Sequence, residues 1–125
     1  MNLLREAIIQ SALGPSSPTA DDGHCRRFRF RADFPGFSGH FPGYPILPAI
    51  LQVLLAQMLV EETAGTEMRL AGLERARFTR RILPEETVRV TVVRQAKEGP
   101  SRYDARLTVD DEAAAQFVLV FSQLS

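Results

Sequence analysis

The sequence predicts an α+β domain in which one long apolar helix packs against one antiparallel sheet. Residues 46–60 contain no charged side chain and have the length of one helix buried on all sides. This run is shorter than the roughly 20 residues that a membrane span needs. Residues 87–95 and 102–109 alternate apolar and polar side chains, the period of strands with one buried face. Residues 114–122 are the last predicted strand, with Phe117, Leu119 and Phe121 facing inward. Short turns join all the strands predicted after the helix, including the one at residues 69–78, and favour an antiparallel meander. A helix on such a sheet is an α+β layer architecture.

Length and composition are those of one ordinary globular domain. The chain has 125 residues, which is enough to build a core without disulfides or metals. Hydrophobic residues make up 45% and charged residues 24%, both typical of a globular protein. The formal net charge is zero, so the overall charge does not favour nucleic acid as a partner. The single cysteine, Cys25, cannot form an intramolecular disulfide and does not support a cysteine-based zinc site.

The first residues of the sequence argue against a secretory signal. Residues 3–13 have the pattern of a short helix that ends before Gly14 and Pro15. Arg5 and Glu6 lie inside its apolar pattern, which a signal peptide would not tolerate. We therefore expect a cytoplasmic protein.

We expect residues 1–125 to form a single domain, because no internal repeat or low-complexity segment divides the sequence. The alternation of Phe28 and Phe30 with arginines predicts a first strand at residues 26–33. The other expected parts are an N-terminal helix and loop at 1–24, a loop and the central helix at 34–62, and antiparallel strands at 69–122, with a bulge at Gly72 and a tight turn at 110–112.

A loop rich in proline and glycine precedes the apolar helix. Residues 34–48 contain four prolines and three glycines, a density that fixes a backbone path unlike a helix or strand. His40 lies in the middle of this loop, and an imidazole titrates near neutral pH. The pattern predicts a loop that holds one imidazole at the mouth of the helix. Taken alone, His40 could equally be a structural histidine bonded to a loop carbonyl.

The loop and helix together resemble a known family. Residues 39–43 read GHFPG, and residues 45–48 read PILP immediately before the apolar helix. This order resembles the signature of the 3-hydroxyacyl-acyl-carrier-protein dehydratases (FabA/FabZ-like), which have the hotdog fold, a sheet wrapped around a central helix. Residues 70–78 and the ILP at 82–84 are similar to the strand and turn that follow the helix in that family. The resemblance runs from about residue 34 to the C-terminus.

This resemblance implies roles for individual residues. His40 matches the catalytic base, which removes the proton next to the thioester carbonyl of a 3-hydroxyacyl substrate. Ala49 stands where the family has a glycine whose backbone N–H binds the enolate oxygen, with Gly43 as a further backbone group. A helix N-terminus suits that task because its first N–H groups are free and its dipole end is positive. The acyl tunnel is expected beside Phe41, Pro48 and Val53.

The sequence departs from the family at the position of the catalytic acid. The family carries an Asp or Glu on the helix where this chain has Leu54. Gln57 lies about one turn further and could hold a water or a hydroxyl, but an amide cannot donate a proton as an acid does. Glu61 lies about 10 Å further along the helix axis, too far for direct contact. The base and the oxyanion donor are therefore predicted, and the acid is missing.

The resemblance also implies partners. The substrate is an acyl thioester carried on the phosphopantetheine of acyl carrier protein or coenzyme A, so no metal or other cofactor is expected. Arg80 and Arg81 could receive an acidic carrier protein, although strand arginines are more often only solvated. Neither nucleic acid nor membrane is expected as a partner. Relatives pair two sheets edge to edge, which implies a homodimer or a trimer of dimers, with a heteromeric partner as an alternative.

Three functions stay open. The first is dehydration of 3-hydroxyacyl thioesters in fatty acid or related acyl-chain biosynthesis, with His40 as the base. The second is an acyl-thioester-binding subunit of a heteromeric dehydratase, impaired by itself, which Leu54 favours. The third is another hotdog activity such as thioester hydrolysis, which relies on a helix carboxylate in relatives and is disfavoured by the same leucine. One fold supports many reactions, so fold alone does not decide among them.

Overall fold

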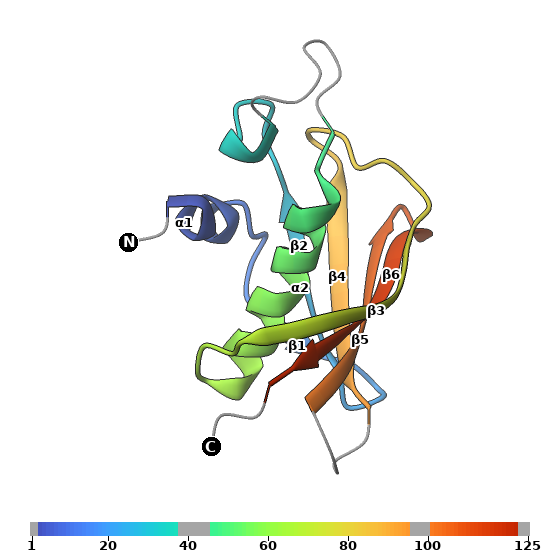
Figure 1. Ribbon diagram of the computed structural model, residues 1–125. Helices are drawn as coiled ribbons and strands as arrows, with labels where there is room; N and C mark the ends of the chain where they lie inside the picture. The colour runs from blue at the N-terminus through green and yellow to red at the C-terminus, as the bar shows by residue number, and fades with distance from the viewer. Residues whose placement is uncertain (1–2, 38–45, 96–100, 123–125) are drawn as a thin grey trace.

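The computed structural model describes residues 3–37, 46–95 and 101–122. One sheet and one long helix form its two layers, and the helix α2 (Ala49–Ala64) lies across a face of the sheet (Figure 1). A shorter helix α1 (Leu3–Gln10) and a single 3-10 turn η1 (Pro35–Phe37) lie on the helix side of the molecule. The strands are β1 (Ser17–Pro18), β2 (His24–Arg29), β3 (Leu70–Phe78), β4 (Thr87–Arg94), β5 (Ser101–Val109) and β6 (Glu112–Phe121).

The sheet is antiparallel throughout, with the strand order β1-β2-β4-β5-β6-β3. The predicted meander is confirmed for β4, β5 and β6, which are neighbours in sequence and in space. It is wrong for β3, which pairs with β6 at the far edge instead of lying beside β4. β2 fills the place beside β4, so the chain leaves β3 at one edge and returns to the middle of the sheet.

Two local features of the sheet agree with the sequence. The register of β3 against β6 shifts between Leu70 and Gly72, at the predicted bulge, and shifts again between Glu74 and Arg77. Asp110 and Asp111 form the two-residue turn from β5 to β6, with φ angles of 51° and 64°. Two consecutive positive φ angles are typical of the type I′ turn, whose twist matches that of a hairpin.

The central helix α2 begins and ends later than the apolar run at residues 46–60. Leu47 precedes a proline, and the ring of Pro48 disfavours helical backbone at that residue, so the helix starts only at Ala49. At the other end Gly65 adopts a left-handed conformation with φ of 76°, and its N–H donates to the carbonyl of Glu61 at 2.9 Å. A glycine in this conformation is a frequent helix C-terminus because it has no Cβ to clash.

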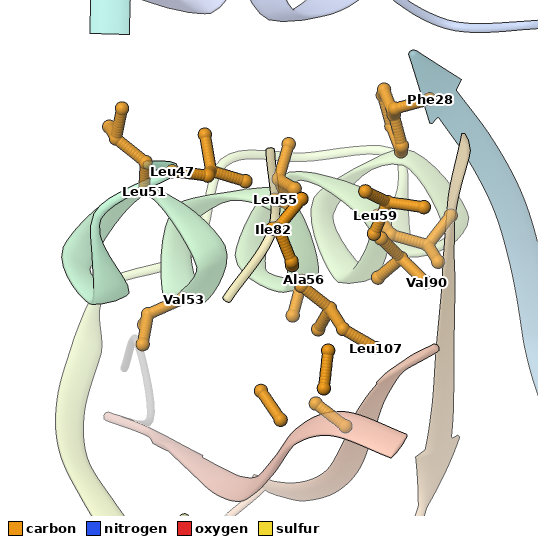
Figure 2. Packing of buried hydrophobic residues seen from close by; sticks show 14 of the residues in the cluster. Phe28, Leu47, Leu51, Val53, Leu55, Ala56, Leu59, Ile82, Val90 and Leu107 are labelled. Atoms are coloured by element: carbon orange, nitrogen blue, oxygen red, sulfur yellow. The ribbon is translucent and has the colours of Figure 1, made fainter. Parts of the chain in front are cut away.

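The core lies between α2 and the sheet. Figure 2 shows Val53, Ala56 and Leu59 on the helix together with Val90 of β4 and Leu107 of β5. The inward residues of the strands are buried as the alternation predicted, among them Val88, Val90, Val92, Ala105, Leu107, Phe117, Leu119 and Phe121. None of the helices in the described ranges is long and apolar enough to cross a membrane.

The expectation that α2 is buried on all sides is wrong. Ile50 is 77% exposed, and Leu54, one turn further along the helix, is half-buried. Leu54 is covered in part because it packs against the core. Ile50 and Leu54 therefore form an apolar stripe on the outward side of α2, exposed at Ile50 and partly covered at Leu54.

Two ion pairs hold the C-terminal end of α2. Glu61 is 8% exposed and accepts a hydrogen bond from Nη1 of Arg5, on α1, at 2.7 Å. Glu62 pairs with Arg26 of β2. These contacts explain why the helix continues through two glutamates beyond its apolar run, since each carboxylate finds a cation from a distant part of the chain.

Candidate active site

The N-terminus of α2 carries two free backbone donors. Pro48 precedes the first helical residue with no side-chain cap, and its carbonyl accepts from the N–H groups of Leu51 at 3.0 Å and Gln52 at 3.1 Å. The N–H groups of Ala49 and Ile50 have no hydrogen-bond partner among the residues that the structure describes. Free N–H groups at the positive end of a helix can stabilise a carbonyl oxygen that gains negative charge.

The chain that leads into α2 is held by hydrogen bonds on both sides of Leu47. Leu47 is 1% exposed, and its N–H donates to the carbonyl of Ile82 at 2.9 Å. The carbonyl of Leu47 accepts from Nε2 of Gln52 at 3.0 Å. The loop after β3 and the first turn of α2 together therefore set where the helix begins.

Two of the three predicted tunnel residues lie in this part of the chain. Pro48 is half-buried at the start of the helix, and Val53 is 9% exposed and points into the core (Figure 2). His40, Phe41 and Gly43 lie outside the described residues, so their predicted roles stay predictions.

The structure places Leu54 on the outward stripe of α2 beside Ile50. Between residues 34 and 60 the sequence has no Asp or Glu, so the first carboxylate of the helix is Glu61. That carboxylate is engaged by Arg5 at 2.7 Å and by the N–H of Met68 at 3.0 Å. The helix itself therefore carries no free carboxylate near Leu54.

Gln57 is engaged elsewhere. Its Nε2 donates to the carbonyl of Met68 at 3.1 Å and lies 3.4 Å from Oε2 of Glu61. The bond to Met68 ties α2 to the segment that enters β3, while the contact with Glu61 lies within the helix. In this arrangement the amide joins two elements of the fold, and a role as substitute for the acid would require it to leave Met68.

The two arginines proposed for carrier docking have different surroundings. Arg80 donates to both oxygens of Glu86, at 3.0 and 2.8 Å, and to Glu112 of β6 at 3.0 Å. Arg81 is exposed and forms no ion pair with another described residue. It precedes Ile82, which binds Leu47, so its backbone lies beside the chain that enters α2. Arg80 therefore braces the loop after β3, while Arg81 is available to a partner.

The brace formed by Arg80 predicts a pH-dependent loss of stability. Hydrogen bonds from Arg80 hold the pKa of Glu86 below its ordinary value of 4.5, against the opposing effect of burial. A lowered folded-state pKa stabilises the protein above the unfolded-state pKa, and this stability is lost as pH falls through the folded-state value. Arg80→Met should therefore lower the free energy of unfolding at pH 7 by about 1–3 kcal/mol, the usual worth of hydrogen bonds to charged groups.

Urea unfolding at several pH values measures this effect. The difference between Arg80→Met and wild type should shrink as pH falls from 4.5 through the lower folded-state pKa of Glu86. Arg81→Met is the matched control and should unfold like wild type at every pH. A difference for Arg80→Met that stays constant down to pH 2 would show that the Glu86 pair does not supply the stability.

Comparison with solved structures defines the class of the fold. The chain superposes on the dehydratase heterocomplex ApeI:P from Xenorhabdus doucetiae with a TM-score of 0.74, 17% identity, and coverage of 90% of this chain and 96% of that one. It also matches a thioesterase superfamily protein with a TM-score of 0.64 and 14% identity, covering 86% of this chain and 52% of that one. These likenesses show the fold, which is the hotdog fold predicted from the sequence.

Sequence comparison identifies the family. Residues 17–117 match the family model of the ApeI-like proteins, described as ApeI dehydratase. The 3-hydroxyacyl-acyl-carrier-protein dehydratase FabZ of Chloroflexus aggregans is 35% identical over 99 residues, covering 73% of this chain and 69% of the relative. The FabZ of Bacillus pumilus is 38% identical over 94 residues, covering 69% and 65%. The chain belongs to the ApeI-like family of hotdog dehydratases.

Interpretation of the sequence overlooked Gln52. Its amide lies in the first turn of α2, is 4% exposed and holds the carbonyl of Leu47. The available signal was its position: Gln52 is the only polar side chain in the first two turns of an otherwise apolar helix. A polar residue there must find a partner on folding, and the partner that it finds is part of the candidate site.

Proposed function

We propose that this protein converts 3-hydroxyacyl thioesters into trans-2-enoyl thioesters. The observation that carries the proposal is the uncapped N-terminus of α2, which follows the GHFPG loop in a chain of a dehydratase family. His40 takes the proton from the carbon next to the thioester carbonyl, and the N–H of Ala49 binds the enolate oxygen. The 3-hydroxyl leaves as water with a proton supplied by a partner chain or by a bound water, and the imidazolium of His40 returns the proton that it took to solvent. Phosphopantetheine of acyl carrier protein or coenzyme A presents the substrate.

A thioester assay tests this proposal. The purified protein is mixed with 3-hydroxybutyryl-pantetheine or with crotonyl-pantetheine, and the absorbance of the enoyl thioester follows both directions of the reaction. Release of free thiol is measured in the same samples. Interconversion without thiol release supports dehydration, whereas thiol release with no interconversion would replace it with thioester hydrolysis.

A second candidate function is that of one subunit of a heteromeric dehydratase. Leu54 occupies the acid position, and the stripe formed by Ile50 and Leu54 is open to another chain. We infer that a partner chain covers this stripe and brings the missing carboxylic acid to the substrate. The chain is similar in fold to a protein described as part of a dehydratase heterocomplex, which supports the inference. On its own the chain would then bind acyl thioesters and turn them over slowly.

The outer edge of β3 predicts assembly with a second chain. No described strand pairs with that edge, and Leu73 and Phe78 of β3 are 42% and 41% exposed. An edge with free backbone groups and apolar side chains favours pairing with another strand. We expect a dimer, either of two copies or of two different chains, with a trimer of dimers as the larger form.

Light scattering at micromolar concentration measures the assembly. Leu73→Arg should shift the protein toward monomer because it places a charge within the pairing edge. Leu13→Arg is the control, since Leu13 is similarly exposed, at 41%, but lies outside β3. The prediction would be contradicted if the wild-type protein formed no dimer with itself and none with a co-purified partner chain.

Carrier docking is expected to depend on Arg81. An exposed guanidinium attracts an acidic protein through charges that salt screens over about 10 Å at 0.1 M. The affinity for holo acyl carrier protein should fall between 50 and 300 mM salt, as checked by calorimetry, and Arg81→Glu should weaken it further. Arg80→Glu is unsuitable because it would place a third carboxylate against Glu86 and Glu112. If the affinity changed neither with salt nor in Arg81→Glu, Arg81 would be a solvated surface residue with no part in carrier docking.

A further inference from the structure

One buried amide side chain near the candidate oxyanion donors uses its nitrogen in a hydrogen bond but leaves its oxygen without a partner among the described residues. Gln52 is 4% exposed, and its Nε2 donates to the carbonyl of Leu47 at 3.0 Å. Its Oε1 is buried and accepts no hydrogen bond in the described part of the chain. A buried acceptor without a donor destabilises a protein, and an apolar residue at this position would avoid that loss. The hydrogen bond that the amide donates must therefore contribute something that offsets this loss of stability.

What the hydrogen bond contributes is indicated by the residue that it holds, Leu47. The N–H of Leu47 is bound to Ile82 at 2.9 Å and its carbonyl to Gln52, so both sides of this residue are fixed. Pro48, which follows, has a restricted φ and no N–H of its own. The N–H of Ala49 shares a planar peptide unit with the carbonyl of Pro48, which accepts from the N–H groups of Leu51 and Gln52. The hold on Leu47 sets where Pro48 lies, and the contacts to the Pro48 carbonyl set its direction, so together they aim the Ala49 N–H.

We propose that Gln52 is a positioning residue for the dehydration reaction: its amide holds Leu47 so that the N–H of Ala49 points at the thioester oxygen. The inference rests on the proposed function. Gln52 touches no reacting atom and acts only through the backbone of residues 47–49. Misplacement of a reacting group by 1 Å can slow a reaction by ~10²-fold, so loss of the amide should act mainly on the chemical step.

The experiment measures how strongly the site polarises a bound thioester, independently of turnover. Crotonyl-pantetheine labelled with ¹³C at the carbonyl is added to the full-length protein, and the carbonyl stretching band is recorded by infrared difference spectroscopy. Correctly aimed N–H donors shift this band to lower frequency. The variants are Gln52→Leu and Gln52→Glu, with Val60→Ala as the control for lost stability, since Val60 is fully buried near the other end of the same helix.

We expect the shifted band in wild type and in Val60→Ala, and its loss in Gln52→Leu. In an active preparation kcat of Gln52→Leu should fall by ~10²-fold with KM nearly unchanged. Gln52→Glu keeps the shape of the side chain and covers the case in which the leucine variant does not fold. Its protonated carboxyl can donate to Leu47 and its carboxylate cannot, so its band should be shifted at low pH and unshifted at high pH.

Two results would overturn the inference, and they differ from each other. The carbonyl band could stay shifted in Gln52→Leu, or its position in Gln52→Glu could be the same at low and high pH. Either result would show that the amide of Gln52 does not orient the Ala49 N–H, and would leave the proposed function intact. Absence of any thioester binding by wild type, alone and with a co-purified partner chain, would overturn the proposed function and this inference with it.

Discussion

His40→Ala should abolish the interconversion of 3-hydroxyacyl and enoyl thioesters. The proton next to a thioester carbonyl is weakly acidic, and a positioned base contributes about 10²- to 10⁴-fold to its removal. With no other titratable side chain between residues 34 and 60 apart from Tyr44, the loop and helix offer no replacement base that titrates near neutral pH. The measurement is the initial rate with crotonyl-pantetheine, made on the assembly in which wild type is most active.

The second histidine provides a matched control. His24 lies at the start of β2, paired in register with Val92, so His24→Ala removes an imidazole from the sheet and leaves the helix N-terminus intact. Its rate should equal that of wild type. Equal rates for wild type and His40→Ala would show that another group is the base, and that the family's role for this histidine does not apply to His40.

Leu54→Glu should raise turnover in the protein assayed without a partner. A general acid contributes about 10²- to 10⁴-fold, and the outward, half-buried position of Leu54 gives a carboxyl group access to a substrate beside α2. Burial among apolar neighbours raises the pKa of a carboxyl group, which keeps part of it protonated and able to donate. The gain should therefore be largest at mildly acidic pH, measured as kcat for 3-hydroxybutyryl-pantetheine.

Leu54→Gln separates acid catalysis from a change in polarity. An amide of the same shape has hydrogen-bond donors but no acidic proton, so this variant should show no gain. Placing a carboxylate in apolar surroundings also destabilises the fold, and unfolding must be measured on the same samples. Wild-type rates typical of an efficient enzyme, lost in His40→Ala and unchanged in Leu54→Glu, would show that position 54 is not the empty acid position.

Local features of this fold could be read from the sequence because local rules govern them. The alternation in β4 and β5 predicted which side chains face inward, and Phe117, Leu119 and Phe121 of β6 are buried as predicted, although Val118 between them is buried as well. Gly65 lies at the end of α2, where a glycine favours a helix C-terminus. The turn at Asp110 and Asp111 followed from two adjacent aspartates between alternating segments, since aspartate tolerates left-handed backbone better than most residues. Each of these outcomes depends on residues only a few positions apart.

Other features depend on residues far apart in the chain and could not be read from it. The pairing of β3 with β6 is a choice among strands of similar pattern. The engagement of Glu61 by Arg5, and of Gln57 by Met68, requires α1 and the start of β3 to reach the helix. Arg80 looked like Arg81 in the sequence, yet only Arg80 finds two carboxylates. For the site, the helix N-terminus was predictable. The polarity of Gln52 was visible in the sequence, but its hydrogen bond to the carbonyl of Leu47 was not.

The strand order has a consequence for how the chain matures on the ribosome. β6 is bonded to β5 on one side and to β3 on the other, although β3 is synthesised well before it. At ~5–20 residues per second, β3 waits for seconds without a hydrogen-bonding neighbour. Folding therefore cannot close the sheet progressively from the N-terminus. A nascent chain stalled before residue 112 would expose the unpaired strand to chaperones and proteases, and only the emergence of β6 would remove that exposure.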